Sequence, residues 1–127
     1  GKPNDPARVI NIGSMDGIHV PVSQGMGTFA YSASKAAVHH LTRTLSVELG
    51  PRNITVNAIA PGYYLSKMTA QTLDNHIETI KKACPLNRIG SPAEMAGIAI
   101  YLASRAGSYT NGAVIPVDGG THLSKNG

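Results

Sequence analysis

Two residues spaced four apart, Tyr31 and Lys35, are the clearest candidates for chemistry in this chain. They belong to the pentapeptide Tyr-Ser-Ala-Ser-Lys, and a spacing of four places both side chains on one face of a helix. A phenol is a weak acid, with a reference pKa of about 10, but a neighbouring ammonium group favours its ionised form. The pair could therefore transfer a proton to or from a substrate. Because the chain contains five tyrosines, the spacing alone is a weak signal.

Composition narrows the classes of protein to which the chain can belong. With 127 residues, of which 42% are hydrophobic, it can form one moderate core, so we expect no more than one domain. The single cysteine, Cys84, excludes an intrachain disulfide and a cysteine-rich metal cluster. The apolar runs of the chain are too short to cross a bilayer, and its amino end lacks a signal-peptide pattern. We therefore expect a cytoplasmic protein without a membrane partner.

The formal net charge of +4 raises the question of nucleic-acid binding. The eleven lysines and arginines are scattered, and aromatic residues do not interleave with them, so we expect no nucleic-acid partner. A basic surface equally suits an anionic cofactor or acyl carrier, which it would attract over a distance.

Short β-rich segments alternate with helical segments along the chain. Strands are predicted at residues 8–12, 54–59 and 113–117. This alternation predicts an α/β protein with a parallel sheet. Ligands of such sheets bind beyond the carboxyl ends of the strands, which is where we expect the site. The turns at these ends are Gly13-Ser14, Ala60-Pro61-Gly62 and Asp118-Gly119-Gly120.

Three helices are predicted between these strands. Residues 31–49 carry an apolar stripe and stop at Gly50-Pro51, which is typical of a helix carboxyl end. A second helix is expected at residues 69–83. The third begins after Ser91, with Pro92 and Glu94 completing a capping box, and reaches about residue 104. The apolar stripe of the first helix comprises Ala37, Val38, Leu41, Leu45 and Leu49.

Four motifs in order give the sequence a family resemblance. Each stands at a predicted strand end or helix start: Asn11-Ile12-Gly13-Ser14, Tyr31-Ser32-Ala33-Ser34-Lys35, Asn57-Ala58-Ile59-Ala60-Pro61-Gly62 and Val117-Asp118-Gly119-Gly120. Together they resemble the landmarks of the short-chain dehydrogenase/reductase family, most closely its 3-oxoacyl reductases, including the branch associated with rhamnolipid synthesis. The resemblance implies the carboxyl-terminal half of a Rossmann-type, doubly wound parallel sheet. Residues 1–127 would then be a partial domain that lacks the amino-terminal cofactor-binding half.

The resemblance also implies catalytic roles for three residues. Tyr31 corresponds to the family's catalytic tyrosine, which donates its proton to the substrate oxygen during reduction. Lys35 corresponds to the lysine that assists this tyrosine and hydrogen-bonds the nicotinamide ribose, for which its three donors and long stem are suited. Ser14 corresponds to the serine that holds the substrate carbonyl or hydroxyl. Ser14 and Tyr31 are farther apart than is usual, which we attribute to an inserted loop; Ser23, inside that loop, is the alternative to Ser14.

The loop after the second predicted strand resembles the loop that contacts the nicotinamide in this family. We therefore expect cofactor contacts from Pro61, Gly62, Tyr64 and Ser66, in addition to Tyr31 and Lys35. Ser66 stands where the family usually has threonine, so it keeps the hydroxyl but lacks the methyl group that restricts its rotamer. Two alternatives stay open for Tyr63 and Tyr64: they line the substrate mouth, or they are ordinary loop aromatics.

Two further patterns are not expected to form sites. Residues 25–30 match the dinucleotide pattern G-x-G-x-x-A before a helix, but Pro21 and Ser23 interrupt the segment before it, so a buried strand does not lead into the motif. His39 and His40 are adjacent in a predicted helix, where their side chains diverge by about 100°. We expect no metal site.

The glycine-rich cofactor fingerprint of the family is missing from the sequence. The resemblance favours NADP over NAD, but the residues that choose between them belong to the missing half. We expect an oxidoreductase whose full-length parent, a homo-oligomer, reduces a small-molecule carbonyl such as a 3-oxoacyl thioester or oxidises an alcohol. The chain alone is expected to be inactive, because hydride transfer needs the cofactor at near-attack distance. The alternative is a noncatalytic binding or oligomerising protein of the same fold.

Overall fold

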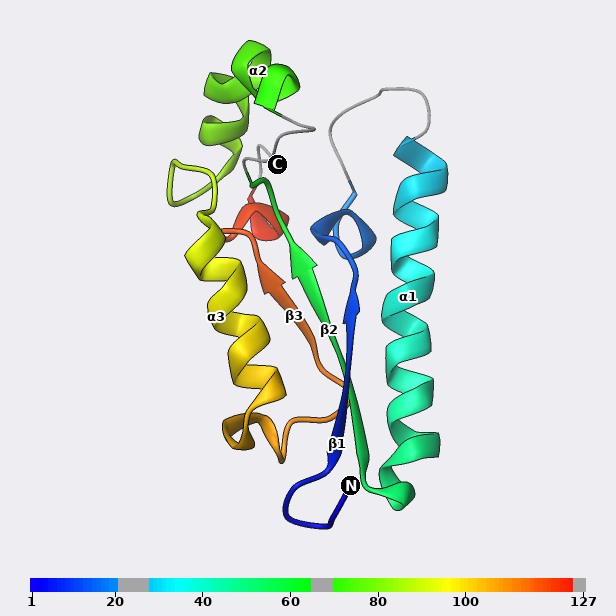
Figure 1. Ribbon diagram of the computed structural model, residues 1–127. Coiled ribbons are helices and arrows are strands. Elements are labelled where there is room, and N and C mark those ends of the chain that lie inside the picture. The colour runs from blue at the N-terminus through cyan, green and yellow to red at the C-terminus, as the bar shows by residue number, and fades with distance from the viewer. Residues whose placement is uncertain (21–27, 65–69, 125–127) are drawn as a thin grey trace.

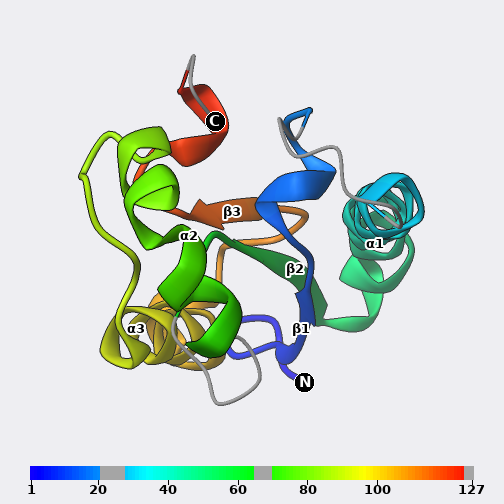
Figure 2. The ribbon, with the colours of Figure 1, turned by 90° about the horizontal axis from the view of Figure 1, so that it is seen from above.

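A three-stranded parallel sheet with helices on both faces makes up the fold (Figure 1). The computed structural model describes residues 1–20, 28–64 and 70–124. Seen from above, α1 covers one face of the sheet, and α2 and α3 lie on the other side (Figure 2). The elements in chain order are β1 (Ala7–Ile12), η1 (Met15–Gly17), α1 (Thr28–Leu49), η2 (Gly50–Arg52), β2 (Ile54–Pro61), α2 (Ala70–Ala83), α3 (Pro92–Ala103), η3 (Arg105–Gly107), β3 (Val114–Val117) and η4 (Thr121–Leu123). The predicted α/β class with a parallel sheet is confirmed.

The strands lie in the order β1-β2-β3, so β2 is central. Residues 55–60 of this strand are all buried, as expected for a central strand covered on both faces, and Val56, Ala58, Ile59 and Ala60 are its apolar members. Ile12 at the end of β1 is in register with Ile59, and Pro61 at the end of β2 is in register with Val117. The carboxyl ends of all three strands therefore meet at one edge of the sheet.

The predicted helix boundaries agree with the structure within a few residues. At the start of α3, the carboxylate of Glu94 accepts hydrogen bonds from the amide (2.8 Å) and the hydroxyl (3.0 Å) of Ser91, as the capping-box motif predicts. After α1, Asn53 adopts a left-handed conformation (φ 59°) that turns the chain into β2. In the part of the chain that the structure describes, no helix combines the length and the apolar character needed to cross a membrane.

The face that α1 turns to the sheet differs from the predicted one. Leu41 was expected on the buried stripe but is 51% exposed, and Ala37 is exposed as well. The buried residues are instead polar: His39, Thr42 and Ser46. The physical reason is that the hydroxyls of Thr42 and Ser46 donate to carbonyls of their own helix, at 2.8 and 2.7 Å, so their burial leaves no unpaired donor. The prediction was therefore wrong for Ala37 and Leu41, whereas Val38, Leu45 and Leu49 of the same stripe are partly buried.

Candidate active site

Ser14 lies two residues after the end of β1, at the carboxyl edge of the sheet. The amide of Gly13 donates to the carbonyl of Ile59 at 2.7 Å, which extends the pairing of β1 with β2 up to this point. Ser14 is buried and caps η1, with its Oγ accepting a hydrogen bond from the amide of Asp16 at 3.1 Å. A serine hydroxyl that accepts one hydrogen bond can still donate its own proton to another partner. Ser14 can therefore donate to a ligand oxygen.

Tyr31 and Lys35 lie on one face of α1, as their spacing predicts. The Nζ atom of Lys35 is 5.7 Å from the centre of the Tyr31 ring. The same Nζ donates a hydrogen bond to the carbonyl of Ile12 at 3.2 Å. Ile12 ends β1 and precedes Ser14 by two residues, so Lys35 connects the tyrosine to the strand that carries the serine. Tyr31 is 48% exposed, which leaves its ring accessible to a ligand.

His39 is a residue of this region whose role the sequence analysis missed. Its Nε2 accepts a hydrogen bond from the backbone amide of Ser14 at 3.2 Å, and the side chain is buried. Burial is the main cause that lowers the pKa of His39; the positive charges of Arg43 and Lys35 lower it further, whereas a hydrogen bond with the backbone of Gly17 opposes the shift. The available signal was its position, four residues after Lys35 on the same helix face.

Gly62 brings the turn after β2 against the turns that follow β1 and β3. Its amide donates to the carbonyl of Val117 at 3.1 Å. A Cβ atom at position 62 would lie 2.6 Å from the Cβ of Asp118 and 3.3 Å from the Sδ of Met15. Only glycine permits this approach without displacing its neighbours, so the predicted Pro61-Gly62 motif has a packing reason in this structure.

The two tyrosines after Gly62 lie in different surroundings. The hydroxyl of Tyr64 donates to the carbonyl of Val117 at 2.9 Å, and its ring lies so close to Gly90 that a Cβ there would collide with it. Tyr63 is partly exposed; burial and then the negative charge of Asp16 raise its pKa. Tyr64 thus packs against β3, and the placement of Tyr63 at the substrate mouth stays a prediction.

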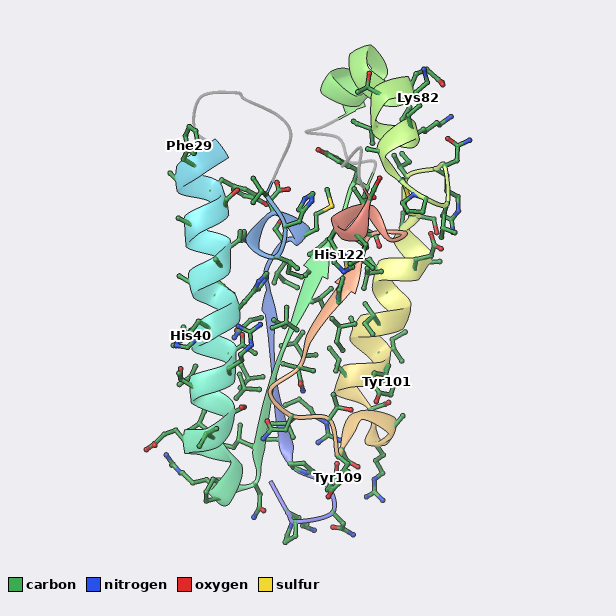
Figure 3. The ribbon with its side chains drawn as sticks, turned by 180° about the vertical axis from the view of Figure 1, so that it is seen from behind. Phe29, His40, Lys82, Tyr101, Tyr109 and His122 are labelled. Carbon is green, nitrogen blue, oxygen red and sulfur yellow. The ribbon has the colours of Figure 1, made fainter. Side chains whose placement is uncertain are left out.

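The Asp118-Gly119-Gly120 turn holds a buried carboxylate. Oxygen atoms of Asp118 accept hydrogen bonds from the amides of Gly120 (3.0 Å) and His122 (2.9 Å) and lie 2.8 Å from Nδ1 of His122. Gly119 and Gly120 have φ values of 64° and 89°, a conformation that favours glycine. Figure 3 shows His122 near the carboxyl ends of the strands. Gly62 packs against this turn, at Asp118.

Three features named from the sequence lie outside the described residues. Ser66 belongs to residues 65–69, and Ser23 and the glycines of the G-x-G-x-x-A pattern belong to residues 21–27. The cofactor contact of Ser66 and the choice of Ser14 over Ser23 therefore stay predictions.

The chain is similar to known proteins over nearly its whole length. A family model described as Enoyl-(Acyl carrier protein) reductase matches residues 2–122. The rhamnolipids biosynthesis 3-oxoacyl-[acyl-carrier-protein] reductase of Pseudomonas aeruginosa is 48% identical over 121 residues, covering 94% of this chain and 46% of the relative. Galactitol 2-dehydrogenase (L-tagatose-forming) of Cereibacter sphaeroides is 43% identical over 114 residues, covering 88% of this chain and 44% of the relative.

A solved structure is similar over almost the whole described fold. The Pseudomonas aeruginosa RhlG/NADP active-site complex has a TM-score of 0.88 and 46% sequence identity, covering 97% of this chain and 48% of that one. The predicted fold class, part of a Rossmann-type parallel sheet, is confirmed by this match. The chain spans about half the length of the curated relatives that it matches.

Proposed function

The chain belongs to the short-chain dehydrogenase/reductase family, and from this premise we propose that it is part of an oxidoreductase that transfers hydride between a nicotinamide cofactor and a small carbonyl or alcohol substrate. The observation that carries this proposal is the position of the Lys35 ammonium. It lies 5.7 Å from the Tyr31 ring and donates to the carbonyl of Ile12, two residues before Ser14. A phenol, a cation and a serine hydroxyl thus gather at the carboxyl edge of the sheet.

In this proposal, Tyr31 acts as the proton donor. During reduction, the bound nicotinamide supplies a hydride to the carbonyl carbon. The electron pair of the carbonyl π bond moves to the substrate oxygen, which takes the phenolic proton of Tyr31. Lys35 stabilises the phenolate that remains, because its positive charge lies beside the ring. Ser14 donates a hydrogen bond to the same substrate oxygen while its Oγ accepts from the amide of Asp16.

The residues present fit a nicotinamide ribose. The ammonium of Lys35 has three N–H donors, one of which goes to the carbonyl of Ile12, so the others can reach ribose hydroxyls. Tyr31 is half exposed beside it. We infer NADP as the cofactor, because the similar RhlG structure is a complex with NADP. Pro61, Gly62, Tyr64 and Ser66 remain the proposed contacts to the nicotinamide end.

We propose a 3-oxoacyl thioester as the first substrate to test. The reason is the 48% identity to a 3-oxoacyl-[acyl-carrier-protein] reductase. A sugar alcohol is the second, because a relative at 43% identity is a galactitol 2-dehydrogenase. We propose that residues 1–127 form a partial domain without the adenosine and pyrophosphate site, and we expect that it does not turn over alone. Nicotinamide-dependent carbonyl reduction by the purified 127-residue chain would contradict that expectation.

The test of the proposed function is the substitution Tyr31→Phe in the full-length parent. The loss of a general acid is expected to lower kcat about 100- to 10,000-fold, with cofactor affinity nearly unchanged. Oxidation of the reduced nicotinamide by each substrate class measures the rate. Tyr109→Phe is the matched control, because Tyr109 is fully exposed and Figure 3 shows it at the end of the molecule opposite η1 and η4. Undiminished turnover by the Tyr31 variant would show that Tyr31 is not the acid.

A noncatalytic binding or oligomerising protein is the second candidate. It is supported by the exposed apolar side chains Phe29, Leu41 and Val47 of α1. If the parent shows no nicotinamide-dependent turnover but self-associates through this helix, the second candidate is favoured. Sedimentation of the parent and of its Leu41→Glu and Val47→Glu variants measures that association.

A further inference from the structure

We propose that His39 is a positioning residue that holds Ser14 in place through the serine's backbone amide. The inference deepens the proposed oxidoreductase function and rests on it. His39 does not touch the reacting atoms in this proposal. It acts through Ser14, whose hydroxyl is proposed to bind the substrate oxygen.

His39 accepts a hydrogen bond from the backbone of Ser14. The amide of Ser14 donates to Nε2 of His39 at 3.2 Å, and the imidazole is only 2% exposed. A neutral imidazole has one nitrogen that accepts and one that donates, so this bond assigns the proton to Nδ1. Ser14 is buried as well. A buried amide that loses its acceptor is costly, so the bond has a strong tendency to persist while the histidine is neutral.

The imidazole of His39 packs against η1 without free space between them. A Cβ atom at Gly13 would collide with the imidazole, and one at Gly17 would lie 2.8 Å from its Cε1. The ring thus fills the space beside both glycines that flank this short turn. Its position is fixed by contact on two sides, and it cannot approach η1 more closely without displacing the backbone.

One face of α1 bonds to the backbone on both sides of Gly13, just after β1 ends. Lys35 donates to the carbonyl of Ile12, and His39, one helical turn later, accepts from the amide of Ser14. The two bonds flank Gly13. Tyr31 precedes Lys35 by one turn on the same face, so a single row of helix residues fixes the serine relative to the proposed proton donor. A shift of about 1 Å in such an arrangement can cost about 100-fold in rate.

The experiment compares three substitutions of His39 in the full-length parent. His39→Leu removes the acceptor at similar volume. His39→Gln keeps an acceptor at about the reach of Nε2, whereas His39→Asn is too short to reach Ser14. His40 is the matched control, since it is the next residue of α1 and is exposed (Figure 3). The readouts are kcat, KM for substrate and for cofactor, and hydrogen exchange of the Ser14 amide.

We expect His39→Leu and His39→Asn to lower kcat about 10- to 100-fold. The KM for the cofactor should stay within about twofold, and the Ser14 amide should exchange about tenfold faster, as expected for loss of about one hydrogen bond. His39→Gln should recover most of the rate and of the protection, and His40→Leu should change neither. If His39→Leu fails to fold, the contrast between Gln and Asn decides the question.

Two results would overturn the inference. One is a His39→Leu enzyme with unchanged kcat and unchanged Ser14 exchange; the other is equal behaviour of the Gln and Asn variants. A Ser14→Ala variant separates this failure from failure of the proposed function. Full turnover by Ser14→Ala overturns the proposed role of the serine, whereas an inactive Ser14→Ala beside a fully active His39→Leu overturns the role of His39 alone.

Discussion

Replacement of Lys35 by methionine should slow the chemical step by an amount that the structure allows us to bound. The change removes a positive charge 5.7 Å from the centre of the Tyr31 ring. With the phenolate charge placed at the ring centre, two unit charges at this separation interact by about 0.7 kcal/mol at the dielectric constant of water and about 3 kcal/mol at the effective value of a protein surface. If that interaction stabilises the phenolate formed on proton donation, its loss lowers kcat about 3- to 150-fold.

The assay is the rate of nicotinamide oxidation by the full-length parent at saturating cofactor, so that weaker ribose binding does not enter kcat. Lys35→Arg keeps the charge and should lower kcat less than Lys35→Met. The control is Lys82→Met, because Lys82 is exposed in the last turn of α2 (Figure 3). Urea denaturation checks stability, for which loss of the hydrogen bond to Ile12 should cost about 1 kcal/mol. A Lys35→Met enzyme with unchanged kcat, beside an inactive Tyr31→Phe enzyme, would refute the electrostatic role of the lysine.

Three further predictions concern stability and titration. The pKa of His39 is lowered from 6.5 in the folded protein. The contribution of the neutral His39 to the free energy of unfolding should therefore be complete above about pH 6.5 and diminish as the pH falls toward the lowered pKa. His39→Gln should flatten this pH dependence, which urea denaturation at several pH values measures. The pKa of Glu94 is lowered to about 2, first by its hydrogen bonds with Arg88, so its carboxyl resonance should titrate near that value and move upward in Arg88→Met. Gly62→Ala should destabilise the protein by about 1–3 kcal/mol, because the new Cβ would collide with the backbone of Asp118. Gly97→Ala should be neutral or stabilising, because the space around position 97 of α3 is open.

The sequence was most informative where local chemistry decides the backbone. Ser91, Pro92 and Glu94 mark the start of α3 because capping bonds form between residues three apart, whatever the rest of the chain does. The same holds for Gly119 and Gly120 after β3, which adopt positive φ; after α1 the left-handed residue is Asn53 and not Gly50. Parallel strands then bring their carboxyl ends to one edge, so turn residues distant in sequence could be expected to meet.

The sequence was less informative about which face of α1 is buried. Hydrophobicity predicts that Leu41 faces inward, but the structure buries Thr42 and Ser46 instead. Their hydroxyls bond to carbonyls of their own helix, and Thr42 also accepts from the side-chain amide of Asn11 at 3.0 Å. These bonds make short polar residues acceptable in the core, and a pattern based on hydrophobicity alone does not count them.

The polar inner face of α1 has a consequence for how the site is built. An apolar face would pack against the sheet without fixing the helix to particular backbone groups, because apolar contacts have little directionality. Lys35, His39 and Thr42 instead bond to three groups of the strand end: the carbonyl of Ile12, the amide of Ser14 and the side chain of Asn11. Directional bonds of this kind set the register of the helix against β1. The departure from the expected hydrophobic pattern therefore coincides with the face that carries Tyr31, as is expected where a sequence is constrained by a functional site as well as by its core.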